Sequence, residues 1–154
     1  MAAPRDAVER VWRDDGPRLY RSLVAFGGDT ELASDAMAEA FAQALGRGEG
    51  VQAHDRWIWR AAFRIAAGEL KERRRVYAGG DPPATAGMPE PVTDLVRALR
   101  TLSPNQRAAA VLSLYADLPT REVARILACS QATVRVHLSQ ARRRLRMLLE
   151  DTDA

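Results

Sequence analysis

Apolar residues recur every three or four positions along most of this chain, which is the period of an amphipathic α-helix. Three such stripes occupy the first 75 residues and predict helices over about 5–26, 30–45 and 56–75. Gly16 and Pro17 lie inside the first of them, where they are expected to kink or split the helix. The alternating pattern typical of strands does not occur, so the sequence predicts an all-α fold.

The middle of the chain is rich in helix-breaking residues. Seven glycines and prolines fall between Gly79 and Pro91, separated by small and polar side chains. Residues 76–90 are therefore expected to be a flexible linker between two small helical domains, residues 1–75 and 91–154.

The C-terminal domain has the pattern of a helix-turn-helix. Ser103 is a good N-cap with Pro104 in the first helical position. A short helix from Thr120, a tight turn over 128–130 and a long helix from Gln131 follow. This arrangement places a helix in the DNA major groove. The apolar face of the helix after Ser103 is expected to contain Ala109, Leu112, Leu114 and Tyr115.

The amount and distribution of positive charge in the sequence are consistent with a nucleic-acid partner. The net charge is +3, and arginines cluster at 73–75 and 142–146. The single cysteine excludes a disulfide framework, and two histidines make a zinc site unexpected. No catalytic constellation, metal cluster or phosphate-binding glycine loop is visible. We therefore expect a binding protein that is not an enzyme and has no cofactor.

The localisation expected from the sequence is cytoplasmic. The chain contains neither an apolar run of membrane-spanning length nor a signal-peptide pattern at its start.

The order of motifs resembles the extracytoplasmic-function sigma factors of bacterial RNA polymerase, which keep conserved regions 2 and 4. The region 4 pattern of that family reads close to L-P-x-x-x-R, followed by E-I-A-x-x-L and T-V-x-x-x-L-x-x-A-R-x-x-L. The residues here that match it are Leu102, Ser103, Pro104, Arg107, Glu122, Val123, Ala124, Leu127, Thr133, Val134, Leu138, Ala141, Arg142 and Leu145. The region 2 motifs are matched by Ala33, Asp35, Met37, Glu39 and Phe41 and echoed by Trp57, Ile58, Ala62, Leu70, Lys71, Arg73 and Arg74.

This resemblance implies a role for each domain and three partners. Residues 1–75 would be a region 2-like three-helix domain that meets the −10 element, and residues 91–154 a region 4-like domain that reads the −35 element. The partners would be promoter DNA, the clamp helices and flap of core RNA polymerase, and an anti-sigma factor. The free protein is expected to be a monomer without a membrane partner.

Candidate site residues follow from the resemblance and from helix geometry. Those expected to bind the −35 element are Gln131, Thr133, Arg135, Val136, Ser139, Arg142, Arg143 and Arg121. Those expected to bind and melt the −10 element are Trp59, Arg60, Arg64 and Lys71. Asp35 and Glu39 are expected to bind polymerase. Trp59 is preferred over Trp57 for stacking on bases because it lies about 200° around the helix from Trp57, which is expected to be core.

Three region 2 positions depart from the family pattern, namely Ala38, Arg64 and Gly68. They keep open a second hypothesis, a sigma-like regulator that binds DNA without opening promoters. A third is a dimeric activator, because the T-V-R-V-H-L run is also similar to response-regulator output domains. That activator would bind palindromic half-sites one helical turn apart.

Overall fold

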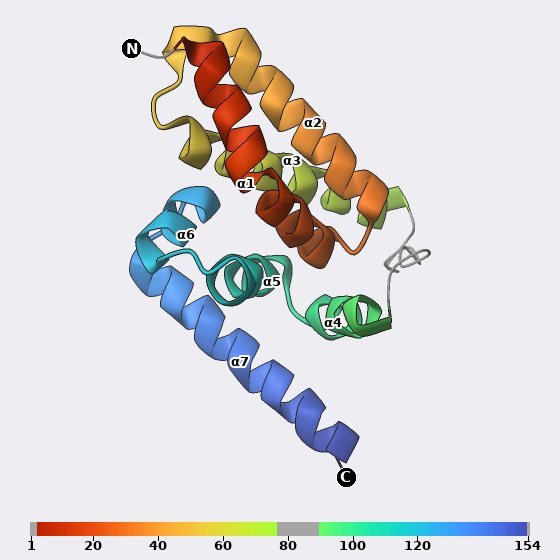
Figure 1. The fold of residues 1–154 in the computed structure, drawn as a ribbon. Coiled ribbons are helices and arrows are strands. Elements are labelled where there is room, and N and C mark those ends of the chain that lie inside the picture. Colours follow the sequence, from red (N-terminus) through yellow and green to blue (C-terminus); the bar gives the residue numbers. More distant parts are fainter. Residues whose placement is uncertain (1–2, 77–89, 154) are drawn as a thin grey trace.

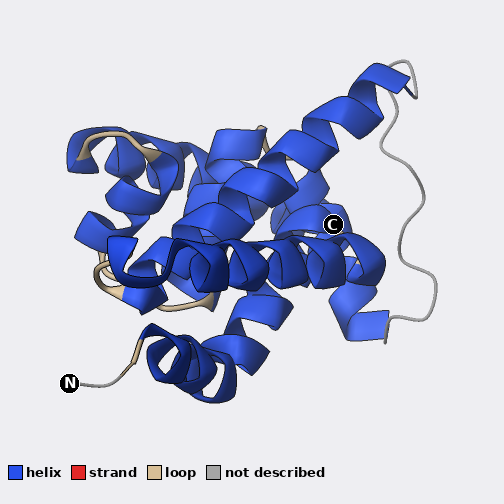
Figure 2. Ribbon diagram, turned by 90° about the horizontal axis from the view of Figure 1, so that it is seen from above, coloured by secondary structure: helices blue, strands red, loops and turns tan. Residues whose placement is uncertain are grey.

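The computed structural model describes residues 3–76 and 90–153, and every regular element within these ranges is helical (Figures 1 and 2). An N-terminal module contains α1 (Pro4–Gly27), α2 (Thr30–Arg47), a 3₁₀ turn η1 (Gly48–Gly50) and α3 (His54–Val76). A C-terminal module contains α4 (Glu90–Arg100), α5 (Pro104–Ala110), a π-helical turn η2 (Val111–Tyr115), α6 (Thr120–Leu127) and α7 (Gln131–Asp153). The predicted all-α fold with a helix-turn-helix is confirmed. Residues 77–89 of the predicted linker lie outside the described residues.

The N-terminal module is a three-helix unit in which each helix packs against the other two. α1 runs through Pro17 as one helix, so the expected split does not occur. Asp29 caps α2 by accepting hydrogen bonds from the amides of Glu31 and Leu32, and its carboxylate also accepts from Arg73 at the end of α3. The loop between the first two helices is thereby tied to the third.

The pKa of Asp29 reports this environment. Burial by itself raises the pKa, but hydrogen bonds from Arg73 and from the amides of Leu32 and Glu31 outweigh it and hold the pKa below its ordinary 3.8. The same pair raises the pKa of Arg73. Both groups are therefore charged in the folded protein at neutral pH.

In the C-terminal module, α5 begins with a capping box between Ser103 and Gln106, and Pro104 occupies its first turn, as the sequence predicts. The expected inward face is correct for Ala109 and Leu112 but wrong for Leu114 and Tyr115, whose side chains are about half exposed (50% and 46%). The reason is η2, where the amide of Ala116 donates to the carbonyl oxygen of Val111, five residues back. The wider turn rotates the residues of η2 out of the helical phase.

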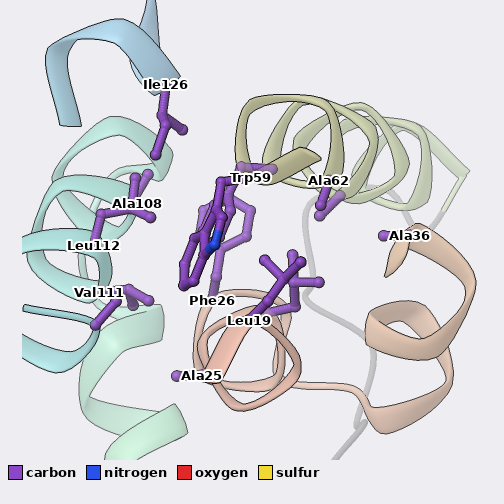
Figure 3. Packing of buried hydrophobic residues seen from close by; sticks show 14 of the residues in the cluster. Leu19, Ala25, Phe26, Ala36, Trp59, Ala62, Ala108, Val111, Leu112 and Ile126 are labelled. Carbon is purple, nitrogen blue, oxygen red and sulfur yellow. The ribbon is translucent and has the colours of Figure 1, made fainter. Parts of the chain in front are cut away.

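The buried side chains of the two modules form one continuous cluster. α1 contacts α4 and η2, while α3 contacts α6. Figure 3 shows Phe26, Leu19 and Trp59 of the N-terminal module beside Leu112 and Ile126 of the C-terminal module. The modules therefore pack against each other directly.

Candidate nucleic-acid interface

The helix-turn-helix is built from α6, a three-residue turn and α7. α6 ends at Leu127, and the next residue, Ala128, caps it in the left-handed conformation (φ 54°). Ser130 then caps α7, because its hydroxyl accepts a hydrogen bond from the amide of Thr133 at 3.1 Å. Val134 and Leu138 are buried against α5 and α6. These contacts fix which face of α7 is turned outward.

The outward face of α7 is a basic groove of about 380 Å³. Its walls are Arg135, Leu138, Ser139, Arg142, Arg143 and Arg146. Within the described part of the chain, none of these arginines forms an ion pair with a carboxylate. Four guanidinium groups along one helix face therefore present positive charge and planar hydrogen-bond donors to a ligand.

The structure brings together most of the residues predicted for the −35 element. Six of them are exposed on α7, namely Gln131, Arg135, Val136, Ser139, Arg142 and Arg143. Thr133 is half-buried and its hydroxyl lies 2.9 Å from that of Ser130, so it belongs to the cap. Arg121 lies on α6 rather than α7, and its side chain is 68% exposed with Glu122 at 3.9 Å.

A second basic hollow, of about 290 Å³, lies between the end of α2 and the first half of α3. It is lined by Gln43, Arg47, Trp57, Arg60, Ala61, Arg64 and Ile65. The guanidinium of Arg47 lies 5.3 Å from the centre of the Trp57 ring, which is within cation–π range. Arg60 and Arg64 are exposed, and neither has a carboxylate partner among the described residues. An aromatic face surrounded by cations is the combination that binds single-stranded nucleic acid.

The expectation that Trp59 is exposed is wrong. Its side chain is only 3% exposed and stacks on Phe63 with ring centres 6.2 Å apart, while its indole N–H donates to Asp15 at 3.1 Å. α3 is covered on this face by α6, which the helical periodicity of a single module does not reveal. The accessible tryptophan on α3 is Trp57, which is half-buried.

Sequence reasoning missed Arg47, Gln43 and the role of Trp57 in this hollow, although a signal was present. Trp57, Arg60 and Arg64 are separated by three and four residues and so share one helix face. Lys71 is exposed further along α3 and does not line the hollow.

Asp35 and Glu39, predicted to bind polymerase, are both exposed on α2. They are four residues apart and hence on one face of the helix. The amide of Gln43 donates to Glu39 at 2.9 Å, which leaves Asp35 as the more open carboxylate of the two. Ala38, one of the three departures from the family pattern, is exposed beside them.

The described residues form neither a metal-binding cluster nor a membrane-spanning helix. No group of three or more His, Cys, Asp and Glu side chains is arranged to hold a metal ion. None of the described helices combines the length and apolar character needed to cross a bilayer.

Comparison with known proteins agrees with this geometry. Residues 93–145 match the family model described as Sigma-70, region 4. No curated protein sequence matches the chain. Among solved structures, the sigma factor RpoE in complex with the anti-sigma factor NepR from Bartonella quintana is similar, with a TM-score of 0.68 and 22% identity over 87% of this chain and 91% of that one. CnrH in complex with the cytosolic domain of CnrY gives a TM-score of 0.76 and 20% identity, covering 97% of this chain and 91% of that one. Residues 93–145 are therefore similar to region 4 of the sigma-70 family, and the chain shares its fold with the sigma factor RpoE and with CnrH, which confirms the resemblance that its motifs predict.

Proposed function

We propose that this chain is a cytoplasmic sigma factor that binds core RNA polymerase and directs it to promoters. The observation that carries the proposal is the basic face of α7, presented by a helix-turn-helix that matches sigma-70 region 4. In this role the N-terminal end of α7 reads the −35 element in the major groove. The protein itself performs no reaction, since the polymerase supplies the chemistry.

The residues of α7 divide into readers and phosphate contacts. Arg135 lies in the first turns of the helix, where side chains reach base edges, and its guanidinium can donate to both acceptors of a guanine. Gln131, Val136 and Ser139 share this exposed first half. Arg142 and Arg143 lie closer to the C-terminal end of α7 and bind phosphates of the DNA backbone. Arg121 binds phosphates in the same way from α6.

The hollow between α2 and α3 is the proposed site for the −10 element. Promoter opening requires unstacked bases to be held as a single strand, which needs an aromatic face and cations along the backbone. Trp57 supplies the face, while Arg47, Arg60 and Arg64 supply the charge. Lys71 extends the basic track along α3.

The exposed carboxylates of Asp35 and Glu39 are the proposed contact with the clamp helices of the polymerase. The purified protein should co-elute with core polymerase that lacks its own sigma factor. Asp35→Arg and Glu39→Arg should each abolish co-elution, because each replaces a carboxylate at the proposed contact by a cation and so reverses the charge that the polymerase would bind. Glu49→Arg, a charge reversal at an exposed position in η1 and outside α2, is the control and should co-elute.

A second candidate function is a sigma-like regulator that binds DNA but does not open promoters, and Ala38, Arg64 and Gly68 favour it. Failure to co-elute, with DNA binding through Arg135 retained, would select this candidate.

An anti-sigma partner is also proposed, since the similar RpoE structure was solved with the anti-sigma factor NepR. Binding to duplex DNA can be measured by fluorescence titration. Arg135→Ala should reduce the binding free energy by about 1–3 kcal/mol at the preferred sequence only, whereas Arg142→Ala should weaken binding to all sequences alike.

A further inference from the structure

Gly68 lies in the interior of α3, and nothing in the fold requires a glycine at this position. Its φ is not positive, so the backbone conformation is open to any residue. A Cβ added there would meet no atom of the described residues within 4 Å. Glycine is one of the least favourable residues in a helix interior. Gly68 therefore weakens α3 without any compensating contact inside the described protein.

Other glycines of the chain have a structural reason, which Gly68 lacks. A Cβ on Gly27 would lie 2.8 Å from the side chain of Leu32. Gly28 has a φ of 70°, and its Cβ would lie 2.9 Å from Val96. Gly46 has open surroundings, but it is the last residue but one of α2, where the helix is ending. Gly68 alone among these four combines a helix interior with open space.

The face of α3 that contains Gly68 is the one proposed to hold a single strand. At 3.6 residues per turn, Gly68 lies within about 60° of Trp57, Arg64 and Lys71 around the helix. Trp57 and Arg64 line the basic hollow, and Arg64 and Lys71 are exposed. Arg64 is about 6 Å before Gly68 along the helix axis, and Lys71 is about 4.5 Å after it. Gly68 is therefore a gap in the cover of side chains between two cations.

The acidic side chains of this part of α3 do not neutralise the gap. Glu69 pairs with Arg73 at 3.4 Å, and Glu72 pairs with Arg75 at 2.8 Å. The two cations beside Gly68 have no carboxylate partner within residues 3–76 and 90–153. A ligand that enters the gap therefore meets positive charge on both sides, which favours the phosphates of a nucleic acid.

We propose that the sugar–phosphate backbone of a single strand crosses α3 at Gly68, in van der Waals contact with the helix backbone. Glycine occurs where a ligand approaches protein backbone closely, because a Cβ would hold that ligand away. Arg64 and Lys71 then bind phosphates on either side of the crossing, and a base of the same strand stacks on Trp57.

Gly68 is thus a positioning residue, which makes no polar contact of its own and acts by letting the strand reach its neighbours. A loss of helix stability at a binding surface in exchange for contact with the ligand is a recognised form of the conflict between stability and function. The inference rests on the proposed −10 site. It assigns a purpose to one of the three departures from the family pattern.

The test compares Gly68→Ala and Gly68→Leu with the wild type, and Gly46→Ala is the matched control because Gly46 does not line the hollow. Full-length protein, alone and bound to core RNA polymerase, is titrated into a fluorescent single-stranded oligonucleotide. Gly68→Leu should weaken binding about fivefold or more, as if one stacked base were lost, and Gly68→Ala should fall between it and the wild type. Gly46→Ala should bind like the wild type.

Urea unfolding of the same proteins gives the second readout. Gly68→Ala should raise the urea midpoint by about 0.2–0.5 M, because alanine favours the helix. A glycine needed only for the fold would move both readouts in the same direction, so a lower midpoint together with weaker binding would overturn the inference. Helical circular dichroism and duplex binding through α7 check that each variant is folded, and Gly68→Ala decides the matter if the leucine variant is not.

The remaining outcomes separate this inference from the proposed function. If the Gly68 variants bound the single strand like the wild type while Trp57→Ala did not, the inference would fail and the proposed −10 site would stand. If they lost co-elution with polymerase but kept single-strand binding, Gly68 would face a protein partner, and the inference would again be overturned. If the wild type bound no single strand, either alone or with polymerase, the proposed −10 site and the inference would fail together.

Discussion

Replacing the buried Arg107 by Met tests whether the guanidinium holds the fold together. Met is similar in length and apolar, so the change removes the hydrogen bonds that the guanidinium donates to the carbonyl oxygens of Phe26, Leu99 and Leu102. A hydrogen bond to a charged group contributes about 1.5–3 kcal/mol, and the two longer bonds here belong at or below the lower end. Relief of the desolvation of a buried cation offsets part of the sum. We expect a net loss of about 3–5 kcal/mol, against a typical total stability of about 5–15 kcal/mol.

The assay is urea unfolding followed by circular dichroism at 222 nm, with a thermal melt in parallel. For a chain of this size a loss of 4 kcal/mol lowers Tm by about 8–16 °C. Arg97→Met on the neighbouring α4 is the control, because Arg97 is exposed and should change stability by less than about 0.5 kcal/mol. A loss of under about 1 kcal/mol for Arg107→Met would refute the view that its three bonds stabilise the fold.

Three further outcomes are expected. Gly68→Ala should stabilise the protein to urea by about 0.5–1 kcal/mol, because glycine disfavours a helix interior and the added Cβ meets no atom within 4 Å; a loss of stability would contradict this. Asp29→Asn keeps a good N-cap but loses the charge paired with Arg73. Since the folded-state pKa of Asp29 lies below 3.8, the contribution of the pair is present above that pH and disappears as the pH falls through the folded-state pKa. Urea titrations should therefore show a deficit for Asn at pH 7 that closes in strong acid, and a pH-independent deficit would refute the assignment. Trp57→Ala should weaken binding of a fluorescent single-stranded oligonucleotide about fivefold or more, with Trp59→Phe as the control that leaves it unchanged.

Local signals in the sequence predicted most of the helix boundaries. Asp29, Ser103 and Ser130 cap the helices for which their side chains are suited, and the turn at Ala128 lies where small residues interrupt the periodicity. These features depend on neighbours within a few residues, so the sequence contains them directly. The helix α4 was missed because the run of prolines and glycines before it masked a short apolar repeat that includes Val92, Val96 and Leu99.

Properties that depend on packing between distant segments could not be read in the same way. Leu114 and Tyr115 follow the α-helical period, but a single π-helical turn moves them to the surface. Trp59 lies on the face of α3 that a three-helix module would leave exposed, and only the contact with α6 buries it. The period of one helix indicates that a face is apolar or polar, not how many neighbours surround the helix.

The two tryptophans of α3 show why this distinction matters for function. They are two positions apart, and so they point to different sides of the helix. Trp57 faces the basic hollow with Arg47, whereas Trp59 faces the other module and is held by Asp15. One side of α3 is therefore a candidate surface for nucleic acid, and the other side packs against the C-terminal module.

The C-terminal module separates the same two tasks onto different helices. α7 carries the basic face, while α5 and α6 carry Arg107 and Glu122, which join the N-terminal module. Arg107 belongs to the motif by which the sequence resembles region 4, yet here its buried guanidinium donates to the carbonyl oxygens of Phe26 at the end of α1 and of Leu99 and Leu102 in its own module. The packing of α7 against α5 and α6 lies inside the module. The helix that is proposed to read DNA is therefore not the one that carries Arg107, so Arg135→Ala should change DNA binding and Arg107→Met should change stability, and the two effects can be measured independently in one protein.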